Sequence, residues 1–553
     1  MPSLQLIVAL SERAPASFAQ VALPSLPQLI ESLVKHPVFH TPEEEADPSW
    51  PNKANLYGLA TEIVTTTAIA LGGNKEQKDS TLDAQTIDRN NPACELGTRT
   101  LLPLLTINNA FSDQETVSKV LPLWMQAAQS VPELFVASDE RVWERSSRFC
   151  LNVVSQDHDA KLAIQAAHVL NLLITFLKNQ LPRDLRENLM KAVLPRLMTI
   201  LLNEVDSDVE GWAAEPVSSS VLDKDTFGDD DGEGEYAFEQ MVAWVKSSPD
   251  IAMAVTLPLL ESNLSGNWSQ QWAAMVCVQA CAEAAPIAFA AHIPTALQAA
   301  LQLCNSANAR VVYQAIQLLG VLCETGNFTV WEHFGERILQ AITKAASSSS
   351  DRVKAMACTT LSSYCRPESA DKLDGARFVV PYLSEVLRGL VQGPLSGPTV
   401  VQSRAVQAVI CLAHAAGSSF APFYPIVMPG LLSLAQHSKS TEYEDIKLQT
   451  TAIEAATIIG QAIGDENIHM YQDDATKIMQ WVIPVLQQGQ DESSSIPMGQ
   501  LLSACARIAT VAGEAYAEYA KVVVPLLIQR ASKSTDVEIA VSMPSMPKMF
   551  ALV

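Results

Sequence analysis

The stretch "FAPFYPIVMPGLLSLAQHSKSTEYEDIKLQTTAIEAATIIGQAIG", residues 420–464, contains two apolar segments separated by a polar one. The first segment carries Pro429 between bulky aliphatic residues, and the second is rich in Ala and Ile. Proline is tolerated in the first turn of an α-helix, where its missing N–H would be unpaired in any case. The stretch therefore predicts a helix that starts at Pro429, a short turn and a second, Ala-rich helix.

The same pattern recurs along the chain. Pro258 and Pro294 are 36 residues apart. The intervals between Pro381, Pro429, Pro484 and Pro525 are 48, 55 and 41 residues. These spacings scatter around the roughly 40–47 residues of a HEAT or armadillo unit. The longer interval from Pro294 to Pro381 fits two units, the second opened by residues 334–346 without a proline. The prolines predicted to mark helix starts are Pro195, Pro258, Pro294, Pro381, Pro429, Pro484 and Pro525.

The repeat and the composition together predict the fold class. Hydrophobic residues make up 48% of the 553 residues, aromatic residues only 6%, and Gly occurs at only 23 positions. Such a composition favours helices over sheets. We therefore expect an all-α protein, a HEAT-repeat α-solenoid that forms a right-handed superhelix of antiparallel helix pairs. At Ser350 to Val353, "SDRV", a helix should start with Asp351 near its positive dipole end and Arg352 within reach of an acid on a neighbouring turn.

The repeat divides the chain into four segments. Residues 1–190 are expected to form degenerate HEAT-like repeats, with long loops at about 41–55 and 72–98. Residues 191–203 are expected to form a repeat helix, residues 204–240 an acidic insertion loop, and residues 241–553 regular HEAT repeats.

The insertion differs from the chain around it in charge. From Glu204 to Glu239 there are 13 acidic residues and one Lys, a net charge of −12 and about half of the −23 of the whole chain. A segment of this kind buries little apolar surface, which predicts a mobile loop. It is either a solvated linker or a docking element. Trp212, a lone Trp among carboxylates with nothing local to bury against, favours an element that docks on a basic surface.

Motifs of catalysis are absent from the sequence. There is no GxxxxGK[ST], HExxH or GxSxG, so we expect that the protein is not an enzyme and needs no cofactor. Cys277 and Cys281 could share a helix face for a metal, but without a His at ligand spacing buried reduced thiols are favoured. His469 lies beside acids, and a solvated turn is favoured there over a metal or acid–base site.

Charge and hydropathy also restrict the partners. The sequence pI is about 4.8 and no Lys/Arg cluster occurs, which argues against direct nucleic-acid binding and for basic protein partners. No run of roughly 18 uncharged apolar residues occurs, the nearest being residues 164–177, so no membrane insertion is expected.

Several stretches of the sequence carry a resemblance to a known family. They are "RVVYQAIQLLG" at 310–320 with "RVKAMACTTL" at 352–361, the stretch at 420–464, and "GQLLSACARIATVAGEAYAEYAKVVVPLLIQRAS" at 499–532. With the acidic "EGWAAE" at 210–215 before them, these stretches resemble the central HEAT repeats of the importin-β (karyopherin-β) superfamily, most closely its importin five (karyopherin beta three) branch.

The resemblance implies a nuclear import receptor that shuttles between cytoplasm and nucleus through the nuclear pore. Such a receptor holds basic cargo on its concave face, releases it to Ran in its GTP form and contacts nucleoporins, and we expect a monomer. Members of the family are longer, so the chain is expected to be a fragment or a truncated gene product that lacks both ends of the full receptor. The alternative is a HEAT-repeat scaffold that holds protein complexes together without a nucleotide switch.

Candidate binding residues follow from the repeat and the resemblance. The second helix of each unit should line the concave face, where its polar residues meet cargo or are merely solvated. The cargo-binding candidates are Trp272, Glu283, Gln317, Glu324, Gln449 and Glu454, with Gln270, Gln314 and Gln407 as further positions. The Ran-binding candidates in the acidic insertion are Asp208, Glu210, Trp212, Glu215, Asp229, Asp230 and Asp231.

Overall fold

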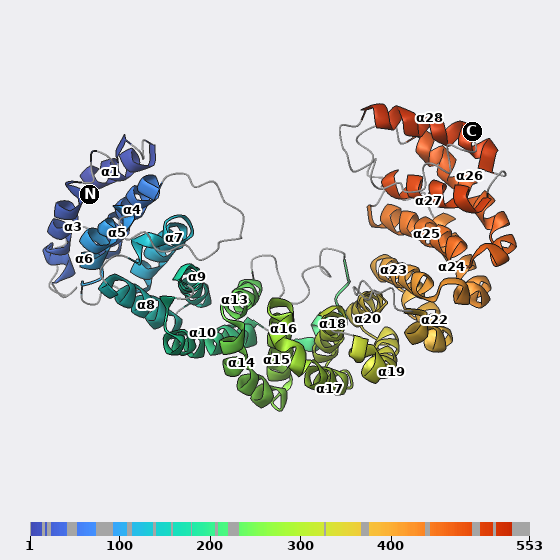
Figure 1. Cartoon of the computed structure of the whole chain (residues 1–553), viewed down its shortest axis with the longest axis horizontal. Helices are drawn as coiled ribbons and strands as arrows, with labels where there is room; N and C mark the ends of the chain where they lie inside the picture. Colours follow the sequence, from blue (N-terminus) through green and yellow to red (C-terminus); the bar gives the residue numbers. More distant parts are fainter. Residues whose placement is uncertain are drawn as a thin grey trace. The chain divides into compact units, whose positions relative to one another are not determined.

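The computed structural model describes most of the chain as helices joined by short turns (Figure 1). No β-strand occurs among the residues it describes. Those residues are 2–13, 17–18, 21, 24–40, 52–72, 92–107, 113–136, 140–155, 159–177, 180–204, 208–218, 232–325, 328–365, 375–436, 443–488, 498–512 and 516–533.

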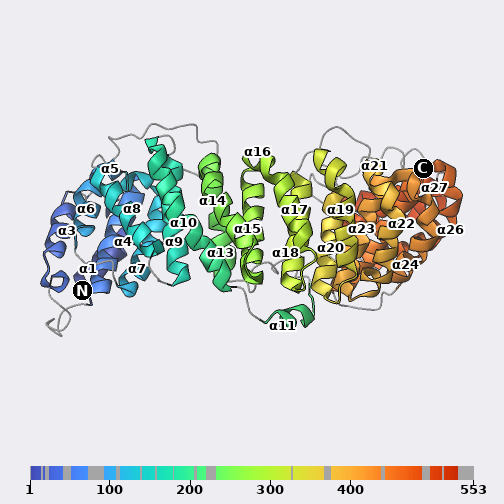
Figure 2. The ribbon, with the colours of Figure 1, turned by 90° about the horizontal axis from the view of Figure 1, so that it is seen from below.

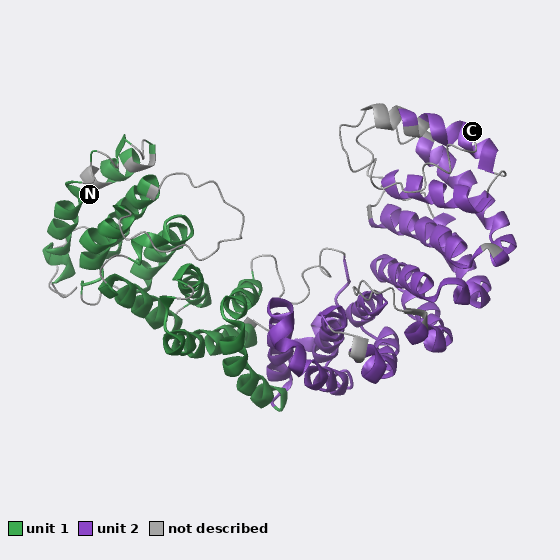
Figure 3. Cartoon of the chain, viewed as in Figure 1, with its two compact units in different colours: residues 1–205, 227–265 green, residues 206–226, 266–553 purple. Residues whose placement is uncertain are grey.

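The chain forms two compact units (Figure 3). Unit 1 comprises residues 1–205 and 227–265, and unit 2 comprises residues 206–226 and 266–553. Part of the acidic insertion thus belongs to unit 2, although the residues on either side of it belong to unit 1.

Unit 1 contains four longer helices that pack on one another in succession, α4, α7, α9 and α13, and a second row formed by α8, α10 and α14. The helices of unit 1 are α1 (Pro2–Arg13), α3 (Leu26–Val34), α4 (Lys53–Gly72), α5 (Pro92–Leu96), α6 (Leu102–Leu104), α7 (Gln114–Ser130), α8 (Glu140–Ser155), α9 (Ala160–Leu177), α10 (Arg183–Glu204), α13 (Glu233–Ser247) and α14 (Pro249–Leu264), with short helices η1 (Pro37–Phe39), η3 (Gly97–Leu101) and η4 (Pro132–Leu134).

Unit 2 contains the regular repeats. Its helices are α11 (Val209–Ala214), α15 (Trp268–Ala284), α16 (Pro286–Phe289), α17 (Ile293–Leu303), α18 (Ala309–Thr325), α19 (Phe328–Ala346), α20 (Asp351–Tyr364), α21 (Gly375–Val379), α22 (Leu383–Gln392), α23 (Thr399–Ala416), α24 (Tyr424–Gln436), α25 (Tyr443–Ala462), α26 (Gln472–Gln488), α27 (Met498–Ala512) and α28 (Ala517–Lys533), with η6 (Ala290–His292), η7 (Val380–Tyr382), η8 (Pro394–Ser396), η9 (Gly417–Phe423) and η10 (Asp465–Met470).

The second helices of the pairs in unit 2 form one continuous row. Helices α15, α18, α20, α23, α25 and α27 each pack directly on the next. Their partners α17, α19, α22, α24 and α26 contact one another more sparsely, and Figure 1 shows them on the outer side of the bend within this unit. We call the first set the inner row. The predicted arrangement of helix pairs in a solenoid is confirmed.

Small residues allow the inner row to pack tightly. In α15 the run from Ala273 to Ala282 is buried on all sides, and in α23 the same holds from Ala405 to Ala413 except at Gln407. A helix that is apolar around its circumference is stable only when neighbours cover it on several faces. These inner helices therefore depend on the helices before and after them, as expected of a repeat array.

The prediction that the prolines mark helix starts is wrong at five of the seven positions. Pro294 lies in the first turn of α17 and Pro381 in the short helix η7. The others lie inside their helices: Pro195 in α10, Pro258 in α14, Pro429 in α24, Pro484 in α26 and Pro525 in α28.

Buried residues before each of these prolines explain the difference. Ile251, Met253 and Val255 precede Pro258 and are buried, as are Val427 and Met428 before Pro429. An internal proline removes one backbone hydrogen bond and costs about 3 kcal/mol. Burying several aliphatic side chains at about 1.5–3 kcal/mol each exceeds that cost, so the helices extend upstream.

The segment boundaries also differ in part from the sequence prediction. Helices α5, η3 and α6 occupy residues 92–104, so the second N-terminal loop ends earlier than residue 98. The rest of that predicted loop, and most of the loop at 41–55, lie outside the described residues. In the insertion, α11 forms at Val209–Ala214 and α13 begins at Glu233, so helical structure covers part of the predicted loop.

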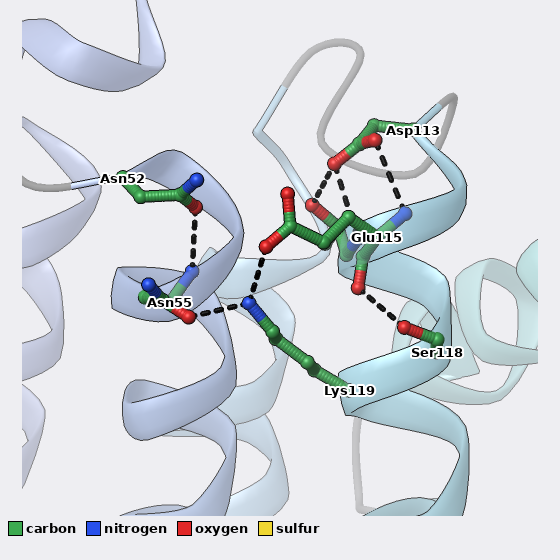
Figure 4. A network of polar contacts seen from close by, with 7 residues as sticks. Asn52, Asn55, Asp113, Glu115, Ser118 and Lys119 are labelled. Carbon is green, nitrogen blue, oxygen red and sulfur yellow. Dashed lines mark hydrogen bonds and ion pairs between the residues drawn. The ribbon is translucent and has the colours of Figure 1, made fainter.

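Polar contacts between neighbouring helices fix their register, as at the start of α4 and α7 (Figure 4). Asp113 caps α7 by accepting hydrogen bonds from the backbone N–H groups of Glu115 (3.1 Å) and Thr116 (3.0 Å). Lys119 pairs with Glu115 at 2.6 Å on its own helix and donates to Asn55 of α4.

Two helical segments, Ala160–Leu177 and Thr399–Gln436, are long and apolar enough to cross a membrane by length and composition. In the most apolar 18 residues of the first segment 61% of the residues are buried inside the protein, and in those of the second 50% are buried. The first segment is α9, which is longer than the apolar run at 164–177 because the helix starts at Ala160 and includes Lys161. Both segments have the burial of core helices in a repeat array.

Candidate partner-binding surface

The polar side chains of the inner row form hydrogen-bonded sets that cross from helix to helix. The Gln314 Nε2 of α18 donates to the Gln279 Oε1 of α15 at 2.9 Å, and the Gln279 Nε2 donates to the Glu283 Oε1 at 2.9 Å. Gln314 is fully buried, whereas Glu283 is exposed at the end of α15. The two amides therefore hold the Glu283 carboxylate in place at the surface.

A second exposed carboxylate lies at the end of α18. Ser363 of α20 donates to the Glu324 Oε1 at 2.6 Å. The two helices are also joined by Thr360, whose hydroxyl donates to the backbone carbonyl of Ile316 at 2.9 Å. Glu324 is thus held by the neighbouring repeat while its side chain stays accessible.

The third carboxylate, Glu454 of α25, pairs with a cation of its own chain. Its Oε1 lies 3.7 Å from the Arg507 Nη2 of α27, and the two side chains are 23% and 19% exposed. The Arg507 Nε also donates to the Thr457 hydroxyl at 2.9 Å. Burial lowers the pKa of Arg507, and the Glu454 carboxylate opposes that shift.

The other cargo-binding candidates are less accessible. Trp272 is 4% exposed and packs in the core, so its side chain is not open to cargo. Gln449 is half-buried and donates to the carbonyl of Ala435 at 2.8 Å, and Gln317 and Gln407 are half-buried. Gln270 completes the N-terminal cap of α15 by accepting from the Asn267 N–H at 2.9 Å. Among the nine positions, Glu283 and Glu324 are the most accessible in this structure.

Trp212 of the acidic insertion is buried, and the basic groups against it belong to the chain itself. Its side chain is 8% exposed. The Arg310 guanidinium lies 5.0 Å from the centre of its ring and that of Arg352 lies 4.9 Å away. The Tyr313 ring packs edge-on against it, with a centroid distance of 5.5 Å and an interplanar angle of 87°.

The helix that carries Trp212 is short and is capped by its own acids. Asp208 accepts a hydrogen bond from the Gly211 N–H at 2.8 Å and so starts α11. Glu215, directly after the helix, pairs with Arg352 of α20. Helix α11 therefore lies against α18 and α20, as Figure 2 shows at the lower edge of the ribbon.

The remaining Ran-binding candidates lie apart from these contacts or outside the structure. Glu210 is exposed on α11. Asp229, Asp230 and Asp231 fall outside the described residues.

Sequence reasoning did not single out Arg310, Tyr313 and Arg507. It did identify Arg352 as able to reach an acid, but that acid is Glu215, 137 residues earlier in the chain, rather than one on a neighbouring turn. The available signal was the recurrence of Arg at the starts of α18 and α20, in "ARVVYQ" and "DRVKAM". No local pattern connects those arginines with the insertion.

Comparison with solved structures identifies the fold. The chain superposes on the karyopherin Kap121p bound to the C-terminus of the phosphatase Cdc14p with a TM-score of 0.70, over 97% of this chain and 48% of that one, at 19% identity. It matches Kap121p bound to RanGTP with a TM-score of 0.66, over 98% of this chain and 49% of that one, again at 19% identity. The fold is that of a karyopherin.

The sequence comparison agrees with this karyopherin fold. The chain is 27% identical to importin subunit beta-3 of Saccharomyces cerevisiae over 246 residues, which are 44% of this chain and 21% of that protein. No protein-family model matches the chain. The resemblance to the importin-β family is thereby confirmed as a distant one, and the expectation of a non-enzymatic protein agrees with it. The chain spans about half the length of the karyopherin structures it matches.

Proposed function

We propose that the chain acts as a nuclear transport receptor, which binds basic cargo on the inner row of unit 2 and releases it to Ran in its GTP form. The observation that carries the proposal is the set of carboxylates held along that row, Glu283 and Glu324 at exposed positions and Glu454 in a partly exposed ion pair. Carboxylates fixed by neighbouring helices lose little side-chain entropy when they pair with Lys or Arg. The net charge of −23 would also steer a basic partner toward the chain.

The similar structures support this proposal by what they contain. Kap121p has been solved with Pho4p, with Ste12p and with RanGTP. We extend the binding of such partners to this chain and propose that it shuttles between cytoplasm and nucleus.

The direct test is a titration of a fluorescent Lys/Arg-rich peptide into the whole chain, followed by RanGTP or RanGDP. We expect binding that weakens with salt, since the attraction between charges is screened beyond about 10 Å at 0.1 M. RanGTP should release the peptide and RanGDP should not. Peptide binding that RanGTP leaves unchanged would favour the alternative of a scaffold without a nucleotide switch.

Matched variants locate the cargo surface. Glu283→Gln and Glu324→Gln should each weaken peptide binding about two- to fivefold at low salt, the range of an exposed ion pair. Glu385→Gln is the control, because Glu385 is an exposed acid on α22 of the outer row. Equal losses for all three variants would show that only net charge matters and that the inner row is not the binding surface.

A second surface fits the proposed contact with nucleoporins. An open pocket of about 510 Å³ lies between η8, α23, α24 and α25, with Leu395, Val427 and Leu434 in its lining. Ile426 at its edge is 59% exposed. Kap121p has been solved with Nup53p. We assign this pocket to an apolar side chain of a nucleoporin, and Ile426→Asp should weaken that binding while leaving the binding of basic peptide unchanged.

A further inference from the structure

The side chains around Trp212 form a site of unusual composition. Arg310, Tyr313 and Arg352 come from the N-terminal parts of two neighbouring inner helices, and we call them the arginine cradle. One aromatic ring lies against two guanidinium groups, each within 5.0 Å of its centre. A cation over an aromatic face contributes about 0.5–1 kcal/mol when exposed and about 2 kcal/mol when desolvated.

The charge of the cradle is balanced by the insertion. The Arg352 side chain is 4% exposed, and its carboxylate partner is Glu215, whose own side chain is 59% exposed. A buried guanidinium without a partner is strongly destabilising, so this position requires an acid beside it. Glu215 supplies that acid, and Trp212, three positions earlier, supplies an aromatic ring.

The resident segment is short. Helix α11 has six residues, and helices shorter than about 12 residues are marginal without tertiary contacts. Its helical form thus depends on contacts with the rest of unit 2, those with the cradle among them, and a segment of the same chemistry would compete for the cradle.

We infer that the arginine cradle is a binding site for an acidic protein segment that carries an aromatic residue followed, three positions later, by a carboxylate. In this structure the site holds the chain's own Trp212 and Glu215. The inference does not depend on the proposed transport function, because it rests only on the contacts of unit 2. A nucleic acid would also offer rings and negative charge, but the net charge of −23 repels a polyanion, whereas a short acidic peptide matches the resident segment.

The test uses a labelled peptide of residues 206–218 and the whole chain with the cradle vacated by Trp212→Ala and Glu215→Ala. In the unaltered chain the tethered segment competes at an effective concentration that can reach about millimolar. We therefore expect the vacated chain to bind the peptide at least about tenfold more tightly than the unaltered chain, measured by fluorescence anisotropy. Glu210→Ala, at an exposed position of the same helix, is the control and should bind like the unaltered chain.

Further variants separate the cradle from a general effect of charge. In the vacated chain, Arg310→Gln should abolish the gain in affinity, and so should a peptide in which the residue equivalent to Trp212 is Ala. Arg310 is half-buried, so this variant remains informative if Arg352→Gln does not fold, and circular dichroism checks the helix content of each variant. Equal peptide binding by the vacated and unaltered chains would overturn the inference. So would a vacated chain that binds a single-stranded oligonucleotide but not the peptide.

Discussion

Trp212 supplies an aromatic ring between two arginines that belong to different repeats. Trp212→Ala should release α11 and speed amide hydrogen exchange at residues 208–215 by about ten- to four-hundredfold, because two exposed cation–π contacts and one aromatic contact together contribute about 1.5–3.5 kcal/mol. Trp212→Phe keeps a ring and should have a smaller effect. Exchange measured by mass spectrometry checks both variants, with Glu210→Ala as the unaffected control.

Glu454 differs from Glu283 and Glu324 because it is already paired with a cation of its own chain. Glu454→Lys would place a cation near the Arg507 guanidinium, now 3.7 Å from the carboxylate. We expect a loss of stability of about 1–2 kcal/mol, between the values for exposed and buried pairs. Weaker binding of basic peptide should accompany this loss, most at low salt.

Glu454→Gln separates the two effects in that prediction. It removes the negative charge without adding a positive one and should affect unfolding less. Denaturant unfolding and peptide titration measured on both variants test this, and unchanged values for Glu454→Lys in both would show that the pair contributes nothing.

The residue scale is also where sequence reasoning reached its limit. Nothing in the sequence around Trp212 indicates what its ring packs against, and the two cations beside it, Arg310 and Arg352, are supplied by repeats far along the chain. Acids on an inner helix could be identified from spacing, as with Glu283 and Glu324. Whether such an acid is paired depends on the next helix, as the Arg507 partner of Glu454 shows.

At the element scale, two glycines in neighbouring helices should respond to substitution in opposite ways. A Cβ at Gly430 in α24 would meet no atom within 4 Å, whereas a Cβ at Gly460 in α25 would lie 2.5 Å from the ring of Tyr471. Gly430→Ala should therefore stabilise the protein by about 0.5–1 kcal/mol through the greater helix propensity of Ala. Gly460→Ala should destabilise it by about 1–3 kcal/mol through overpacking.

Thermal unfolding followed by circular dichroism tests the pair. The expected result is a higher midpoint for Gly430→Ala and a lower one for Gly460→Ala. A lower midpoint for both would mean that α24 needs the flexibility of glycine, which the open space around Gly430 does not indicate.

The inner helices were the most predictable elements. Stretches rich in Ala and aliphatic residues mark them, so the segments at α18, α20 and α25 were located from the sequence. The starts of the outer helices were misplaced, because the rule for proline at helix starts considers only backbone geometry. The burial of residues such as Met428, which carries α24 upstream of Pro429, comes from neighbouring repeats and has no local signal.

At the scale of the whole molecule, the burial of the cysteine thiols shows how completely the repeats cover one another. All ten are free and buried. Burial raises the pKa of Cys304, Cys323, Cys358 and Cys505 to about 12. At pH 8 only about one in ten thousand of such thiols would be the reactive thiolate.

The folded chain should therefore react slowly with a thiol-specific disulfide reagent at pH 8, and ten thiols should react rapidly in guanidinium chloride. The folded-state rate should increase with pH, because the thiolate fraction grows until pH approaches the raised pKa. Absorbance of the released chromophore counts the thiols. Several fast-reacting thiols in the folded chain would show that the array opens locally.

The contact between the insertion and the cradle also has a consequence for the order in which the protein is made. Most contacts in a repeat array form between segments that leave the ribosome close together in time. Glu215 and Arg352 are 137 residues apart, so at 5–20 residues per second the acid waits roughly 7 to 27 s for its partner. During synthesis Glu215 is thus without Arg352 while the repeats between them are translated, and the pair can form only once the start of α20 has been made.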